Sequence, residues 1–148
     1  MFRQHPILTV LTLVYLGIVG LVTLGPQPFD EGSGSLVWAL LRFFSHHRQT
    51  AWIDYWTLQF GANVLMFVPV GLFFLLLLGR RRWWLAVLVG VILTSAIEFT
   101  QQYLPGRVSD PRDVLANSVG ALIGVLIALI VTWPAAIRRA RARRVASA

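Results

Sequence analysis

WWLAVLVGVILTSAIEFTQQY, residues 83–103, is the stretch that decides how this chain folds. It is long and apolar enough to cross the ~30 Å hydrocarbon core of a bilayer as a helix. It also carries Glu98 near its C-terminal end. A carboxylate in hydrocarbon is costly unless it is protonated or partnered, so such residues usually face the interior of a helix bundle. The run therefore predicts a membrane helix that packs against others and buries Glu98 between them.

Three further apolar runs surround this one, and the four together predict an all-α membrane protein. Of the 148 residues, 57% are hydrophobic and 13% are charged, a balance typical of a small polytopic membrane protein. Pro69 removes a backbone donor within the second run, which predicts a kink there. We predict a single domain over residues 1–148, with transmembrane helices at 6–24, 61–78, 83–103 and 114–133 and a basic tail at 134–148.

Clusters of arginine predict the orientation of these helices. Arg80–Arg82 follows the second span, and five arginines lie between Arg138 and Arg144. Loops rich in Lys and Arg stay in the cytoplasm, so both termini are predicted to be cytoplasmic. The net charge of +7 then indicates anchoring and attraction to anionic lipid, and we predict no nucleic-acid partner.

The longest connection between spans, residues 29–60, has two features of the membrane surface. Leu36–Phe44 is too short to cross a bilayer and is a candidate interfacial or re-entrant helix. Trp52, Tyr55 and Trp56 follow it and are typical of an aromatic belt at the bilayer edge.

Metal and cofactor sites are not expected. The chain has no cysteine, which removes thiolate ligands and thiolate nucleophiles. His46 and His47 adjoin Asp54, but their spacing matches no zinc signature. We therefore predict no metal and no cofactor.

Polar side chains at the ends of three predicted spans define a candidate site. With four spans, Asn63 opens the second helix, Glu98 and Gln101 lie near the end of the third, and Asp113 and Asn117 open the fourth. All of these positions lie at one face of the membrane. Because residues three and four apart share a helix face, Glu98 and Gln101 point the same way. We predict an outward-facing polar pocket built by these five side chains.

The turn between the third and fourth spans is predicted to form the rim of the pocket. Arg107 suits bidentate binding of a phosphate or carboxylate, and Asp110 lies beside it. The competing interpretation of Arg107 is a salt bridge to Asp110 or Asp113. For the pocket as a whole the competing interpretation is structural: hydrogen bonds of about 0.6 kcal/mol each would hold the helices together, and Asp113 would cap the fourth helix.

Small residues recur every four positions along the fourth predicted helix, at Ala116, Gly120, Gly124 and Ala128. Such a stripe lets another helix approach closely. The approaching helix belongs either to this chain or to a second copy. A homo-oligomer formed through Ala116, Gly120 and Gly124 is therefore one expectation.

Three motifs, in this order along the chain, resemble the VanZ-like family. NVLMFVPVG at residues 63–71 is similar to its N-x-x-x-F-x-P-x-G segment, and SAIEFTQ at 95–101 to its S-x-x-E-x-x-Q helix. The third motif comprises Pro105, Gly106, Arg107, Asp110, Asp113, Asn117 and Gly120. The resemblance covers residues 63 to about 124. It implies an integral membrane protein, for which we expect the bacterial inner membrane, and for some members low-level resistance to teicoplanin-class glycopeptides. It implies no established reaction.

Three functions fit these observations. The favoured one is a binding or protective module for an amphipathic envelope ligand, either a lipid-linked cell-wall intermediate or a lipoglycopeptide, with membrane lipids as neighbours. The second is an intramembrane enzyme with Glu98 and Asp113 as acid and base; no nucleophile or metal motif supports it, so no residue is assigned as catalytic. The third is a proton-coupled lipid transporter with Glu98 as the relay, which would need an oligomer.

Overall fold

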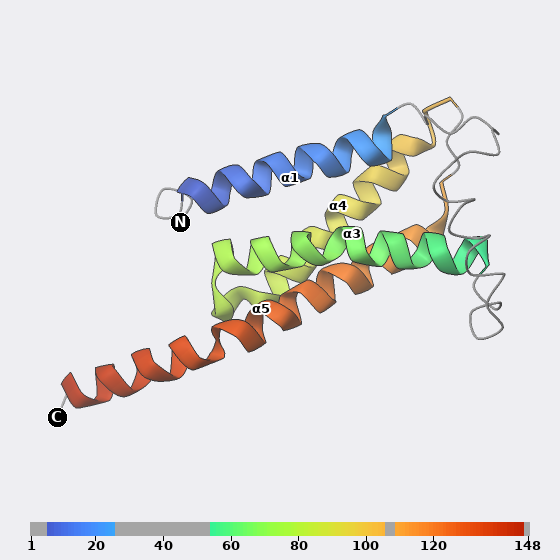
Figure 1. Ribbon diagram of the computed structural model, residues 1–148. Helices are drawn as coiled ribbons and strands as arrows, with labels where there is room; N and C mark the ends of the chain where they lie inside the picture. The colour runs from blue at the N-terminus through green and yellow to red at the C-terminus, as the bar shows by residue number, and fades with distance from the viewer. Residues whose placement is uncertain (1–5, 26–53, 106–108, 147–148) are drawn as a thin grey trace.

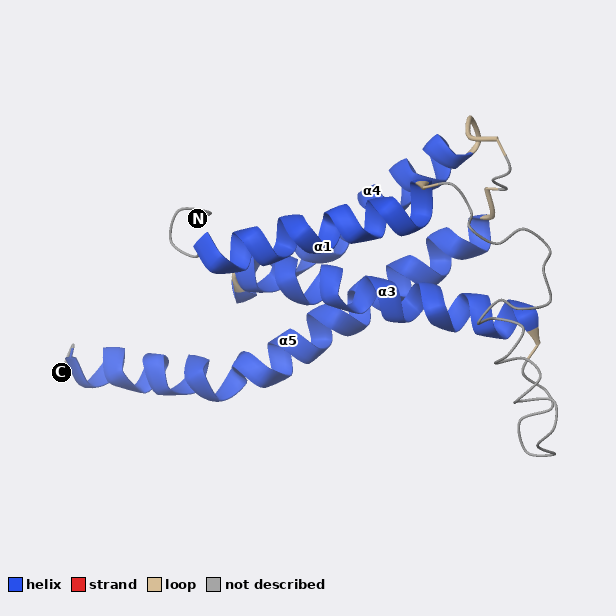
Figure 2. Cartoon of the chain, turned by 45° about the horizontal axis from the view of Figure 1, so that its top comes forward, coloured by secondary structure: helices blue, strands red, loops and turns tan. Residues whose placement is uncertain are grey.

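Every regular element that the structure describes is a helix (Figures 1 and 2). The computed structural model describes residues 6–25, 54–105 and 109–146. Four helices are long and apolar enough to cross a membrane, which confirms the predicted fold class. The elements are α1 (Pro6–Leu24), α3 (Tyr55–Leu78), the short 3-10 helix η2 (Arg80–Arg82), α4 (Trp83–Gln101) and α5 (Pro111–Ala146).

The bundle has two ends that differ in chemistry. At one end, called here the site end, α1 and α4 finish and α3 and α5 begin (Figure 1). At the other, called here the tail end, lie the start of α1, the α3–η2–α4 turn and the C-terminal part of α5. The predicted grouping of polar residues at one end follows from this up-and-down order. Which end faces the cytoplasm stays a prediction.

Two helices begin earlier than predicted because side chains cap them. At α3 the Asp54 carboxylate accepts hydrogen bonds from the Thr57 backbone N–H (2.8 Å) and hydroxyl (2.7 Å), so the helix starts at Tyr55, before the predicted Gly61. At α5 the Asp110 carboxylate accepts a 2.9 Å bond from the Arg112 N–H, and Pro111 occupies the first helical position.

At its other end α5 runs past Pro134 to Ala146, whereas the sequence pattern ended the span at Trp133. Its part that is apolar enough to span a membrane is Pro111–Pro134, close to the predicted 114–133. The basic tail therefore begins as a continuation of the same helix. The candidate interfacial helix Leu36–Phe44 lies outside the described residues.

The core of the bundle is the contact between α3 and α5, which glycine makes possible. A Cβ added at Gly71 of α3 would be 1.9 Å from the Ala121 carbonyl oxygen of α5. A Cβ added at Gly120 of α5 would be 2.1 Å from the Val64 carbonyl oxygen of α3. The backbones approach as closely as small residues in membrane helices allow. The small-residue stripe of α5 is thus occupied by α3 of the same chain, and a homo-oligomer stays a prediction.

Helix α1 covers one side of this pair and presents its other face outward. Thr12, Val19 and Thr23 are buried against the bundle. The Tyr15 hydroxyl donates a 2.7 Å hydrogen bond to the Met66 carbonyl oxygen of α3. The outward side chains of α1 are large and apolar, as expected of a surface that contacts lipid acyl chains.

Candidate functional site

Glu98 is buried near the end of α4, where it holds the segment that leads into α5. Its side chain is 5% exposed. The Oε2 atom accepts hydrogen bonds from the Ser109 hydroxyl (2.9 Å) and from the Asp110 backbone N–H (3.0 Å). The carboxylate thus lies beside the N-terminus of α5, where the helix dipole favours negative charge. These bonds offset the cost of burying the group.

Asp113 lies in the first turn of α5 and is bound from α3. The Gln59 Nε2 atom lies 3.3 Å from each oxygen of the Asp113 carboxylate. The Asn63 side chain, one turn further along α3, also interacts with this carboxylate. Asp110 and Asp113 are both close enough to Glu98 for their charges to interact. Three carboxylates therefore gather around the start of α5: Glu98 and Asp113 accept hydrogen bonds from another segment, and Asp110 accepts one from α5 itself.

Asn117 and Gln101 are buried amides, and each has only one of its two polar atoms hydrogen-bonded. The Asn117 Nδ2 atom donates a 2.9 Å hydrogen bond to Thr94 Oγ1 on α4, while its Oδ1 atom is buried without a partner. Gln101 Nε2 donates a 2.9 Å bond to the Thr23 carbonyl oxygen of α1, and its Oε1 atom is also buried without a partner. Buried acceptors of this kind call for a donor such as an ordered water.

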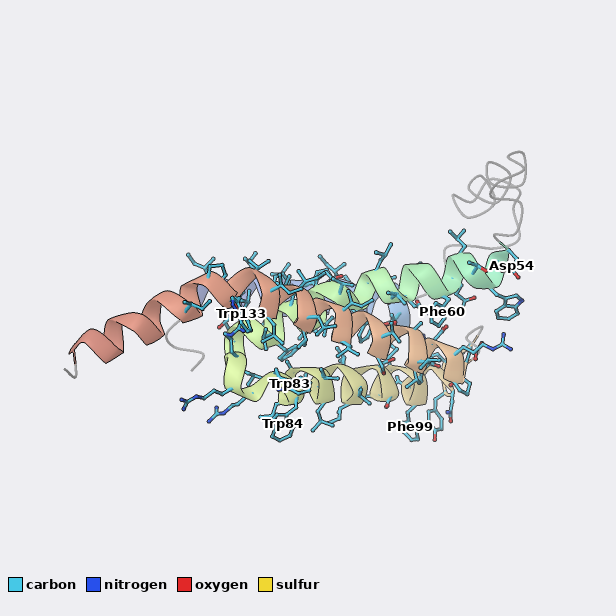
Figure 3. All side chains as sticks on the ribbon, turned by 90° about the horizontal axis from the view of Figure 1, so that it is seen from below. Asp54, Phe60, Trp83, Trp84, Phe99 and Trp133 are labelled. Carbon is cyan, nitrogen blue, oxygen red and sulfur yellow. The ribbon has the colours of Figure 1, made fainter. Side chains whose placement is uncertain are left out.

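A pocket of about 310 Å³ opens at the site end, between the first turns of α3 and α5. The guanidinium carbon of Arg112 lies 5.4 Å from the centroid of the Trp56 ring, a cation–π contact across the pocket. Figure 3 shows Phe60 at the α5 side of α3 and Phe99 on the outward side of α4. The pocket is lined by Trp56, Thr57, Gln59, Phe60, Asp110, Arg112 and Asp113.

The pocket offers both acceptors and donors to a ligand. The carboxylates of Asp110 and Asp113 accept hydrogen bonds, and the Arg112 guanidinium donates them. Trp56 and Phe60 supply apolar aromatic faces. Within the described residues, His, Cys, Asp and Glu form no cluster of three that could hold a metal ion.

The structure places six of the seven predicted site residues. Asp110 and Asp113 line the pocket, and Asn63 lies next to Asp113. Glu98 and Asn117 lie behind it, between α4 and α5. Gln101 was predicted to face the pocket, whereas its side-chain amide donates to the Thr23 carbonyl oxygen of α1. Arg107, the seventh residue, falls outside the described part of the chain.

Several residues that shape the site were missed from the sequence pattern. Gln59 lies one helical turn before Asn63 and on the same helix face. The predicted helix began at Gly61, after Gln59, so Gln59 was not placed on that face. Trp56 was predicted only as part of an aromatic belt, and Arg112 was not singled out. Ser109 carried no signal, because its bond to Glu98 depends on how the turn folds back.

The comparisons with known proteins support a family assignment. No curated protein and no solved structure is significantly similar to the chain. The family model described as VanZ/LLP1 matches residues 11–132, a range that contains the second and third spans and most of the first and fourth. Its four candidate spans make the chain a multi-pass membrane protein. By this match, it belongs to the VanZ/LLP1 family.

Proposed function

We propose that this protein binds the polar headgroup of an amphipathic cell-envelope molecule in the pocket at the site end. One observation carries the proposal: a pocket with carboxylate, amide, guanidinium and aromatic walls lies where two membrane-spanning helices begin. A headgroup at this depth would leave its hydrocarbon tail beside the apolar surface of the same helices. A bacterial inner membrane is the setting that this function implies.

The dimensions of the pocket favour recognition of part of a headgroup. About 310 Å³ is at the lower end of the ~300–1,000 Å³ range of ligand pockets. One sugar or one amino-acid side chain fits such a volume, whereas a whole glycopeptide does not. A lipid-linked cell-wall intermediate and a lipoglycopeptide both offer hydroxyl and amide donors next to an acyl or polyprenyl tail, and both remain candidate ligands.

Asp113 is the residue expected to contact the ligand most directly. It lines the pocket and is held in position by Gln59. Glu98 lies behind it and acts on the ligand only through the Ser109–Asp110 segment. Replacing Asp113 should therefore weaken binding more than Glu98→Gln, since an amide at position 98 still offers an acceptor to Ser109 and to the backbone.

The experiment is a binding titration of purified protein in nanodiscs against teicoplanin and, separately, against a lipid-linked disaccharide–pentapeptide. We expect Asp113→Asn and Arg112→Gln each to weaken binding about tenfold, equivalent to ~1.4 kcal/mol. Asp54→Asn is the matched control, because Asp54 is exposed at the same end and does not line the pocket. Unchanged affinity in both pocket variants, with wild-type elution and helicity, would rule out this pocket as the binding site.

Cell susceptibility then tests whether binding confers resistance. Cells that express wild-type protein should tolerate more teicoplanin than cells with an empty vector, and Asp113→Asn should remove the gain at a matched membrane level. If wild-type expression changes nothing while the purified protein still binds the lipid-linked intermediate, the resistance role fails and the lipid role remains.

A further inference from the structure

A second cavity, about 380 Å³, lies at the tail end of the bundle, far from the proposed headgroup pocket. Apart from one arginine its walls are apolar and come from α5. Ile130 and Trp133 are 71% and 60% exposed, so the cavity is an open groove on the lipid-facing side of the helix. Its lining residues are Arg80, Leu126, Leu129, Ile130, Trp133 and Pro134.

Arg80 is held at one end of this groove by contacts with α5. Its Nη1 atom donates hydrogen bonds to the Leu129 carbonyl oxygen and, at 2.6 Å, to the Thr132 hydroxyl. Its guanidinium carbon lies 5.4 Å from the centroid of the Trp133 ring. A guanidinium carries five N–H donors. Both of these hydrogen bonds come from Nη1, and the other three N–H donors lie on Nη2 and Nε.

The turn before Arg80 explains how a residue of the α3–α4 connection reaches α5. Gly79 has φ +82°, a conformation that side chains other than glycine rarely adopt, and its N–H closes α3 by bonding the Leu75 carbonyl oxygen at 2.8 Å. The chain then turns through η2, so that Arg80 points back across the bundle and Arg81 is exposed.

The tail end is also the basic end of the molecule. All four carboxylates among the described residues, Asp54, Glu98, Asp110 and Asp113, belong to the site end. The groove reaches Pro134, the last residue of the apolar part of α5, and Arg80 is the first residue of the next span. The guanidinium therefore lies at the depth where the hydrocarbon core meets the phosphate layer of a membrane.

We propose that this groove binds one anionic phospholipid, with an acyl chain along Leu126, Ile130 and Trp133 and the phosphate on Arg80. An apolar channel that ends at an oriented guanidinium matches the two parts of such a lipid. A zwitterionic lipid offers the same chains but places a cation beside the phosphate, close to Arg80 and Arg81. The site therefore selects lipids that carry net negative charge. This inference is independent of the proposed function at the site end.

Lipid retention tests the proposal. Full-length protein is taken from nanodiscs of phosphatidylglycerol and phosphatidylcholine with identical chains, and its bound lipid is read by native mass spectrometry. Wild type should retain phosphatidylglycerol over phosphatidylcholine by about tenfold or more. Ile130→Trp, which fills the groove, should lose that retention. Val131→Trp is the matched control, because Val131 is also 71% exposed on α5 but does not line the groove.

Arginine variants separate a built site from a merely basic surface. Arg80→Gln should reduce phosphatidylglycerol retention about tenfold, whereas Arg81→Gln should change it less than about twofold. Equal losses in the two arginine variants, equal losses in Ile130→Trp and Val131→Trp, or equal retention of the two lipids in wild type would each overturn the proposal. Should Arg80→Gln fail to fold, the tryptophan pair alone decides.

Discussion

Gly124 of α5 lies so close to Val68 of α3 that a Cβ at position 124 would be 1.9 Å from the Val68 carbonyl oxygen. Contacts of the same kind occur one turn away at Gly120 and from the other side at Gly71. Lipid tails are as apolar as the helix surface, so the hydrophobic effect does not drive membrane helices together. Close packing of their backbones contributes to their association instead. This crossing sets the spacing of the two helices whose first turns form the pocket at the site end.

Alanine at these glycines should weaken the bundle. Gly124→Ala is expected to destabilise the protein by about 1–3 kcal/mol or more, because the neighbouring atom is backbone and has no rotamer with which to move away. Gly17→Ala is the control: nothing lies within 4 Å of its added Cβ, and alanine in a helix should gain about 0.5–1 kcal/mol. Unfolding titrations in mixed micelles measure both. Equal stability of the two variants would contradict the close crossing.

The bond between Asn117 and Thr94 should couple α4 to α5. Asn117→Ala and Thr94→Ala each remove one partner of a buried 2.9 Å hydrogen bond. A double-mutant cycle is expected to give a coupling of about 0.6 kcal/mol, with an upper value near 1.7 kcal/mol. The cycle is measured by the same unfolding titrations. Additive effects of the two substitutions would show that the bond contributes nothing to stability.

Tyr15 should attach α1 to the bundle through one hydroxyl. Tyr15→Phe removes the bond to the Met66 carbonyl oxygen but keeps the edge-to-face contact with Phe73, whose ring centroid lies 5.8 Å away. We expect a loss of about 0.5–1.5 kcal/mol and faster amide exchange along α1. Leu13→Ala is the control, because Leu13 is an exposed position of the same helix. Unaltered exchange in Tyr15→Phe would mean that apolar packing alone holds α1.

Asp54 should give the start of α3 a dependence on pH. The hydrogen bonds from the Thr57 hydroxyl and then from its backbone N–H lower the pKa of Asp54 from its usual 3.8. A lowered pKa in the folded state means that the cap is fully formed above pH 3.8 and is lost as the pH falls through the lower folded value. The Asp54 carboxyl carbon, followed by NMR titration, reports this pKa.

The amide of Thr57 provides the matching structural readout. Its protection from exchange, relative to Asp54→Asn, should decrease as the wild-type carboxylate is protonated, because asparagine keeps an acceptor that does not titrate. A wild-type Asp54 that titrates at or above 3.8 would contradict the capping geometry.

Much of the fold could be predicted, because a long apolar run in the local sequence is enough to indicate a transmembrane helix. Residues 6–24 form α1 as expected. The starts of α3 and α5 were placed too late, because hydropathy does not register the caps at Asp54 and Asp110. The candidate site was predictable only as a grouping of positions at one end. Its binding role was not tested by the fold and stays a proposal.

The sequence by itself determined that four apolar helices form and that Glu98, Asp113 and Asn117 lie toward one end. Span length and span order suffice for that, because each helix must cross the whole bilayer before the chain turns back. Only the tertiary structure decided the partners: Glu98 with the segment before α5, and Gln101 with α1. Partner choice depends on the rotation of each helix about its axis and on its distance from its neighbours, and the close glycine contacts between α3 and α5 set both for the central pair.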